Sequence, residues 1–107
     1  MPIIRIDFDS QKLSDLDIKN LSEATQKIVS EETGIEDVFV YANSPKFSYK
    51  IAPAEVFIEM SAHKIVDADE LMGRIKTRLS DWKKQNVFPQ SINLTLIPMN
   101  WKVEIDI

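Results

Sequence analysis

The sequence predicts an α/β (α+β) domain made of two β-α-β halves, with a four-stranded mixed sheet, both helices on one face and a short C-terminal strand. Segments in which every second residue is apolar, which is typical of strands, are followed along the chain by segments whose apolar residues have helical spacing. The halves also repeat, because Pro2 and Glu55 at the strand starts, like the helix caps Ser14 and Asp67, lie 53 residues apart. A chain of 107 residues is long enough for one such domain, residues 1–107, and too short for two.

The first half begins with a strand over residues 2–8, where apolar side chains fall on every second position. A helix follows between Ser14, which forms a variant capping box with Asp17, and Gly34, a residue type that commonly ends helices. Its predicted apolar face is Ile18, Leu21, Ala24, Ile28 and Val29. The unbroken run Val38 to Ala42 then predicts a buried strand.

The second half follows the same plan. Residues 55–60 read as a strand, and Asp67 caps a helix whose apolar face is Ala68, Leu71, Met72, Ile75, Leu79 and Trp82. Residues 92–97 supply a further strand that we expect Pro98 to end, since proline donates no ladder hydrogen bond. Residues 101–107 alternate again and predict a short edge strand at the C-terminus.

Composition argues against several classes of function. The net charge of −4, with both signs mixed along the chain, argues against nucleic acid and against an anionic membrane surface as partners. The chain has no cysteine, so disulfides and thiolate sites are excluded, and no apolar run approaches the roughly 18 residues of a spanning helix. We therefore expect a cytoplasmic protein. The absence of metal-ligand spacings and glycine-rich loops gives no reason to expect a cofactor.

The predicted sheet has one face that no helix covers. Two right-handed β-α-β crossovers place both helices on the same side of the sheet. The segments Val38 to Ala42 and Val56 to Ile58 are nevertheless apolar on both sides, which is typical of strands covered on both faces. Another subunit is the simplest cover for the second face, so the sequence predicts an oligomer.

A short chain of two β-α-β halves with a proline directly after the initiator methionine resembles the tautomerase superfamily. The resemblance runs over nearly the whole length and is carried by residues 1–6, 21–25, 33–34 and 96–100. Within the superfamily the chain is most similar to the macrophage migration inhibitory factor branch and its uncharacterised bacterial members. The resemblance implies a tautomerase or isomerase with this two-layer fold that assembles as a homotrimer.

The resemblance makes Pro2 the catalytic residue. Once Met1 is removed, Pro2 carries a secondary amine that can act as a general base on a small enolisable carbonyl acid. A reference α-amino group has a pKa of about 7.7 to 8.0, and burial lowers that value toward neutrality. A retained Met1 would turn the Pro2 nitrogen into an amide without a basic lone pair. The structural alternative is that Pro2 is simply a proline tolerated at the start of a strand.

The resemblance also points to substrate-binding residues. Lys12 lies where one branch of the family carries a carboxylate-binding arginine, and a lysine can hold a carboxylate as a point charge. His63 and Lys64 follow the third strand, and Asn93 and Thr95 align with pocket positions of the fourth strand. Each of these five residues also has a purely structural explanation, as a solvated loop residue or as part of the polar side of a strand. The family's other cationic positions fall on Ile35 and Phe39, so part of its binding pattern is missing.

Two further hypotheses remain open at this point. The first is a non-catalytic oligomeric binding or scaffold protein on the same fold, favoured by the missing cationic positions, because a fold does not determine a function. The second is a ferredoxin-like regulatory dimer, which shares the order of elements but has an antiparallel sheet.

Overall fold

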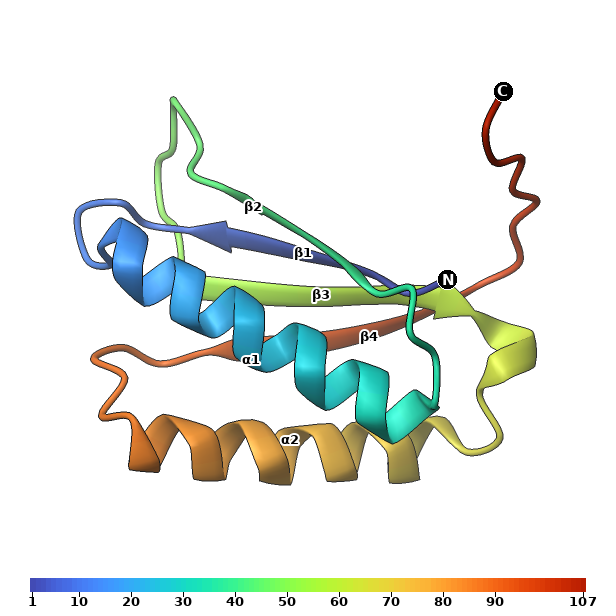
Figure 1. The fold of residues 1–107 in the computed structure, drawn as a ribbon. Coiled ribbons are helices and arrows are strands. Elements are labelled where there is room, and N and C mark those ends of the chain that lie inside the picture. The colour runs from blue at the N-terminus through green and yellow to red at the C-terminus, as the bar shows by residue number, and fades with distance from the viewer.

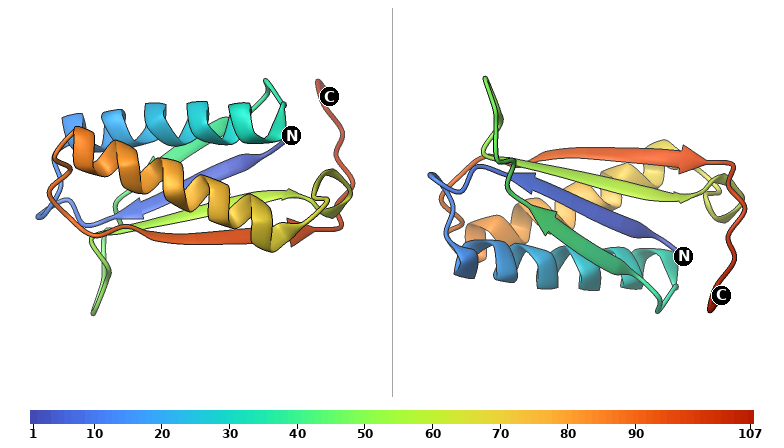
Figure 2. Two further views of the ribbon diagram at one scale, coloured as in Figure 1. Left: turned by 90° about the horizontal axis from the view of Figure 1, so that it is seen from below. Right: turned by 90° about the horizontal axis from the view of Figure 1, so that it is seen from above.

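The computed structural model describes all residues 1–107. One four-stranded sheet carries two long helices on a single face (Figure 1), and the views from below and above in Figure 2 agree on this two-layer arrangement. The elements are β1 (Ile3–Phe8), α1 (Asp15–Thr33), β2 (Phe39–Asn43), β3 (Ala54–Ser61), the short 3-10 helix η1 (Ala62–Lys64), α2 (Ala68–Gln85) and β4 (Asn93–Met99).

The strands lie in the order β2-β1-β3-β4. β1 is parallel to β2 and antiparallel to β3, and β3 is parallel to β4. The predicted mixed sheet with both helices on one face is therefore confirmed. The two parallel pairs contradict the ferredoxin-like alternative, whose sheet is antiparallel.

Both helices begin and end at residues that the sequence marks. The Ser14 hydroxyl accepts a hydrogen bond from the Asp17 backbone N–H at 3.1 Å, and the Asp17 carboxylate accepts one from the Ser14 N–H at 3.0 Å. Gly34 ends α1 with φ 71°, a left-handed conformation that glycine adopts without strain. At the start of α2, the Asp67 carboxylate accepts from the Glu70 N–H at 3.1 Å. These caps satisfy backbone groups that have no partner within the helix.

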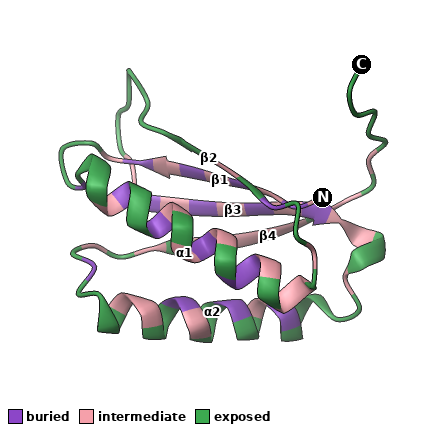
Figure 3. Cartoon of the chain, viewed as in Figure 1, coloured by how far each residue is buried: buried purple, intermediate pink, exposed green.

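The core lies between the sheet and the helices (Figure 3). Ile4, Ile6, Val56 and Ile58 of β1 and β3 have an exposed fraction of 0%, and each contributes about 1.5–3 kcal/mol by its burial. From the helices, the buried side chains are Ile18, Leu21, Thr25, Ile28, Val29, Leu71, Ile75 and Leu79. Most of the predicted helix faces are thus confirmed. Thr25 is buried where Ala24 was expected, and its hydroxyl donates to the Ser22 carbonyl at 3.1 Å.

The prediction of a buried second strand is wrong. β2 runs from Phe39 to Asn43, and only Val40 is partly buried. The apolar run ends up exposed because β2 is an edge strand, with one neighbour in the sheet and nothing on the face away from the helices. Val38, which directly precedes the strand, is the residue of this run that joins the core.

The C-terminal part of the chain also differs from the prediction. Residues 101–107 have no regular secondary structure, so the expected final strand is absent from the single chain. β4 continues through Pro98 to Met99 instead of ending before the proline. β4 lies at the edge of the sheet and has a neighbour on one side only, and proline is tolerated in such an edge strand although it has no N–H to donate.

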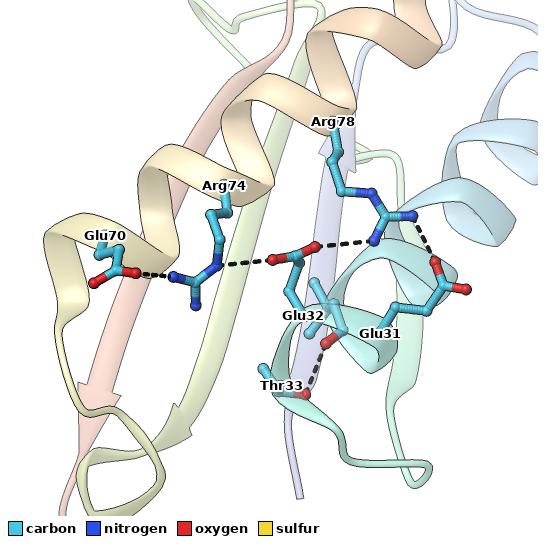
Figure 4. Close-up of polar contacts among 7 residues, drawn as sticks. Glu31, Glu32, Thr33, Glu70, Arg74 and Arg78 are labelled. Carbon is cyan, nitrogen blue, oxygen red and sulfur yellow. Dashed lines mark hydrogen bonds and ion pairs between the residues drawn. The ribbon is translucent and has the colours of Figure 1, made fainter.

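An ion-pair network joins the outer sides of the two helices (Figure 4). The Glu32 carboxylate accepts from Arg74 Nε at 2.8 Å and from Arg78 Nη1 at 3.1 Å. Arg78 also donates to Glu31, and Arg74 donates to Glu70 at 2.6 Å. The hydrogen bond from Arg78 lowers the pKa of Glu31, and the reciprocal bond raises the pKa of Arg78. The network holds the C-terminal half of α1 against α2.

We predict that Arg78→Gln lowers the free energy of unfolding at pH 7 by the small amount typical of exposed ion pairs. Because the pKa of Glu31 is lowered in the folded chain, the stabilisation is present at neutral pH and is lost as the pH falls through that folded-state pKa. Urea unfolding at pH 7 and pH 3 measures this, with Lys76→Gln on the same helix as a control that removes a charge outside the network. An equal loss of stability at both pH values would contradict this role.

Candidate functional site

Pro2 directly precedes β1 and is buried, with a relative exposure below 2%. Its carbonyl accepts a hydrogen bond from the Phe39 backbone N–H at 3.2 Å, which fixes the start of β1 beside the start of β2. The alternation of β1 places Pro2 on the same side as Ile4, toward the helices. With Met1 attached, Pro2 is therefore a buried residue at this end of the sheet.

His63 and Lys64 lie at the same end of the sheet as Pro2. β3 runs antiparallel to β1 with Ile3 opposite Glu59, so the end of β3 meets the start of β1. His63 and Lys64 belong to η1, which follows β3 directly, and both are exposed. The structure thus brings these two predicted binding residues to the Pro2 end of the sheet.

Lys12 and Asn93 lie at the opposite end. Lys12 is exposed in the loop after β1, and Asn93 begins β4 opposite Glu55. Along β3, Glu55 is separated from the position facing Pro2 by five residues, or about 17 Å of extended strand. Within one chain, Asn93 and Lys12 are therefore too far from Pro2 to share a small substrate with it.

Thr95 lies between the two ends, opposite Phe57 on β4. Alternation places its side chain on the sheet face away from the helices, which we call the open face. The open face carries the odd-numbered residues of all four strands, namely Ile3, Arg5, Asp7, Phe39, Tyr41, Asn43, Glu55, Phe57, Glu59, Ser61, Asn93, Thr95, Ile97 and Met99.

Arg5 is held at the middle of the open face. Its Nη1 donates to Glu59 at 2.9 Å and its Nε lies 3.4 Å from Asp7. The guanidinium carbon also lies 4.6 Å from the centre of the Phe57 ring, within cation–π range. These contacts occupy Arg5 with its own strand neighbours, and sequence reasoning did not single it out although strand alternation places it beside both carboxylates.

A cavity of about 610 Å³ lies at the far end of the open face from Pro2, between the sheet and the β2–β3 loop. It is lined by Asp7, Phe8, Asn43, Pro45, Lys50, Ile51, Ala52, Glu55 and Phe57. Asp7 and Glu55 face each other across β1 and β3, and the Asn93 amide donates to Glu55 at 2.9 Å. Lys50 is the one cation among these residues, so the cavity of a single chain is acidic.

The structure offers little support for other kinds of site. It contains no group of three or more histidine, cysteine, aspartate or glutamate side chains placed to hold a metal ion. Neither of the two long helices has the length and apolar character needed to cross a membrane.

Comparisons with solved structures agree with the two-layer architecture. No family model matches the sequence, and no curated protein matches it. Among solved structures, the chain is similar to a fused 4-OT asymmetric trimer, with a TM-score of 0.67 and 11% identity over 94% of this chain and 91% of that one.

Two further solved structures show the same similarity. One is malonate semialdehyde decarboxylase, solved as wild type, as a mutant with its leading proline replaced by alanine, and inactivated, with a TM-score of 0.64 and 13% identity over 95% of this chain and 90% of that one. The other is a macrophage migration inhibitory factor-like protein from Entamoeba histolytica, with a TM-score of 0.60 and 19% identity over 96% and 93% of the two chains.

The chain is thus a two-layer α/β protein with a buried proline at the head of its first strand. The solved structures it resembles are members of the tautomerase superfamily, and the chain has their fold. Several of these solved structures are of enzymes, and what this chain shares with them is the fold.

Proposed function

We propose that this protein is a homotrimeric tautomerase or isomerase in which Pro2, freed by removal of Met1, is the general base on a small enolisable carbonyl acid. The observation that carries the proposal is the burial of Pro2 at the head of β1 on a fold shared with catalytic members of the superfamily. Desolvation disfavours a charged amine, so burial favours the neutral, proton-accepting form of Pro2.

The same end of the sheet carries groups for a negatively charged substrate. His63 and Lys64 are exposed there, and a lysine ammonium can bind a carboxylate or steady an enolate oxygen as a point charge. In this role Pro2 takes a proton from the carbon beside a carbonyl and returns it at the other end of the enolate. No external oxidant or metal is required for such a proton transfer.

The remaining proposed binding residues have to come from another copy. Asn93 lies about 17 Å along the sheet from Pro2, and Thr95 faces the open face, whereas Pro2 points toward the helices. If Asn93 and Thr95 line the same pocket as Pro2, the pocket lies between two subunits. We propose this composite site as the reason why the fold would work as a trimer. Lys12 also lies at the far end of the sheet, so it too would have to come from another copy to share a pocket with Pro2.

We predict that correctly processed protein ketonises the enol of phenylpyruvate or a similar acid, and that Pro2→Ala lowers kcat/KM by about 10²- to 10⁴-fold, the usual contribution of a general base. Pro89→Ala, in an exposed loop beyond α2, is the matched proline control and should retain activity. Intact-mass measurement establishes which form is assayed, and an NMR titration of the Pro2 amine reports its basicity. Equal activity of the Met1-retaining and processed forms would exclude Pro2 as the base.

We also predict that activity returns when two defective variants share a trimer. Pro2→Ala supplies intact Asn93 and Thr95, whereas the double variant Asn93→Ala, Thr95→Ala supplies an intact Pro2. If each site takes Pro2 from one copy and the β4 residues from the next, random mixed trimers carry about one intact site in four. Refolding an equimolar mixture and measuring kcat per chain tests this. Activity equal to the mean of the two separate variants would place the site within one chain.

The second candidate function is a non-catalytic oligomeric binding or scaffold protein. The observation that favours it is the far-end cavity of about 610 Å³, which holds Asp7 and Glu55 and does not include Pro2. In that case Pro2→Ala leaves both ligand binding and assembly unchanged, and neither form turns over substrate.

A further inference from the structure

The far-end cavity of about 610 Å³ brings charged groups of both signs together with apolar side chains. It lies beneath the β2–β3 loop, which Figure 1 shows in green, rising from the sheet on the side away from the helices. Its volume is within the range of about 300–1,000 Å³ that is usual for small-molecule sites. Among its lining residues, Ile51 and Phe57 are apolar and half-buried, whereas Asp7, Glu55 and Lys50 are charged. A cavity of this composition suits a small molecule that has both charged groups and an apolar part.

Two carboxylates of the cavity lie directly opposite each other. Asp7 and Glu55 are partners in the antiparallel ladder of β1 and β3, and both lie on the open face. The Cβ atoms of such partners are about 4.5–5.5 Å apart, and like charges in this position destabilise a sheet. The placement of these two residues therefore costs stability in the free chain, and a cation bound between them would reverse that cost.

Each carboxylate has one oxygen free for a ligand. Asp7 Oδ2 lies 3.4 Å from Arg5 Nε, and Asp7 Oδ1 has no hydrogen bond within the chain. Glu55 Oε1 accepts a hydrogen bond from the Asn93 amide at 2.9 Å, and Glu55 Oε2 has none. These contacts hold the two carboxylates in place. An ammonium group between them can donate to both free oxygens, and such charge-assisted hydrogen bonds are among the stronger ones in proteins.

Lys50 supplies the opposite charge. It belongs to the β2–β3 loop, lines the cavity and forms no ion pair within the chain. A lysine ammonium can hold a carboxylate as a point charge. The two carboxylates nearby would repel a doubly charged phosphate more strongly than a singly charged carboxylate. The cavity therefore favours a ligand with one ammonium group and one carboxylate group.

The far end of the sheet lacks the group that the proposed reaction needs. Ala54 begins β3 as Pro2 precedes β1, and both residues are buried. An alanine inside the chain contributes an amide nitrogen, which cannot act as a base. The far-end cavity is thus suited to binding a ligand and not to the proton transfer proposed at Pro2.

We propose that the far-end cavity binds an α-amino acid with an apolar side chain. The ammonium group of the ligand lies between Asp7 and Glu55, and its carboxylate lies beside Lys50. Its side chain packs against Phe57, where it is removed from water. The inference goes beyond the reaction proposed at Pro2 and does not depend on it, and it gives the second candidate function a class of ligand.

Three probes that share one apolar group separate the contributions of the two charges. Phenylalanine carries both charged groups, phenylethylamine lacks the carboxylate and phenylpropionate lacks the ammonium. Phenylalanine should bind saturably in a calorimetric titration, and the other two should bind about tenfold or more weakly, as expected for losing a hydrogen bond to a charged group. In amide NMR spectra the shifts should change at the lining residues of the cavity. The inference is overturned if neither phenylalanine nor leucine binds saturably, or if the shifts change only at the Pro2 end.

Single-charge variants test the orientation of the ligand. Glu55→Gln should weaken the binding of both phenylalanine and phenylethylamine by about tenfold, whereas Lys50→Gln should weaken only that of phenylalanine. Lys46→Gln is the matched control, because Lys46 lies on the same exposed loop but lines a neighbouring hollow, and it should bind like the wild type. Far-ultraviolet circular dichroism establishes that each variant is folded. If Lys50→Gln has no effect on phenylalanine, or if Lys46→Gln has the same effect, the inference is wrong.

Pro2→Ala separates this cavity from the proposed active site. Because the cavity does not include Pro2, this variant should bind phenylalanine with the wild-type affinity, and a loss of binding would overturn the inference. A wild type that binds phenylalanine but does not turn over an enol would end only the proposed enzyme. A wild type that turns over an enol but does not bind phenylalanine or leucine would end only the inference about this cavity.

Discussion

The antiparallel pairing of β1 with β3 is the constraint on which the rest of this structure depends. It joins the two β-α-β halves, with Ile3 opposite Glu59 at one end and Phe8 opposite Ala54 at the other. The same register aligns the buried residues of both strands under the two helices, so a slip by one residue would turn the core side chains to the open face. It also fixes which ends of the strands meet, and so decides which residues can share a site with Pro2.

The open face follows from the same alternation. Burying every second residue of β1 and β3 under the helices sends Arg5, Phe57 and Glu59 to the other side, where they bind one another. A mixture of aromatic and paired charged groups is typical of a surface that meets another protein, whereas an entirely apolar face would aggregate. The charged groups at the middle of this face are thus paired within the single chain, so the uncovered side of the sheet is not a continuous apolar surface.

The two helices, whose ends are marked by residues close by in the sequence, were predicted well. Ser14, Gly34 and Asp67 mark helix ends through their own hydrogen bonds or backbone angles, so neighbouring residues are enough to read them. The two errors share a cause, since both segments have strand composition but few neighbours: β2 pairs on one side only, and residues 101–107 form no strand pair. Strand propensity reports how well side chains fit a half-buried surface, and sequence does not state which strand will stand at the edge.

The candidate site was predicted in part, for the same reason. Pro2, His63 and Lys64 were among the expected site residues, and the strand register brings these three to one end of the sheet. The separation of Asn93 and Lys12 from Pro2 could not be read from the sequence, because it depends on the order and direction of the strands. The role of each residue stays a prediction.

The charges around the proposed base act in opposite directions. Carboxylates such as Asp7 and Glu55 favour a protonated amine and repel a carbonyl acid, so a subunit that brought its far-end cavity beside Pro2 would leave less of the amine in its neutral, proton-accepting form. Lys64 at the Pro2 end acts the other way but is exposed, and its field is screened by water. Both effects act through space, whereas desolvation acts on an amine nitrogen directly wherever that nitrogen is buried. In the proposed reaction, the neutral amine therefore depends first on how the processed chain packs at the head of β1, and only then on the charges around it.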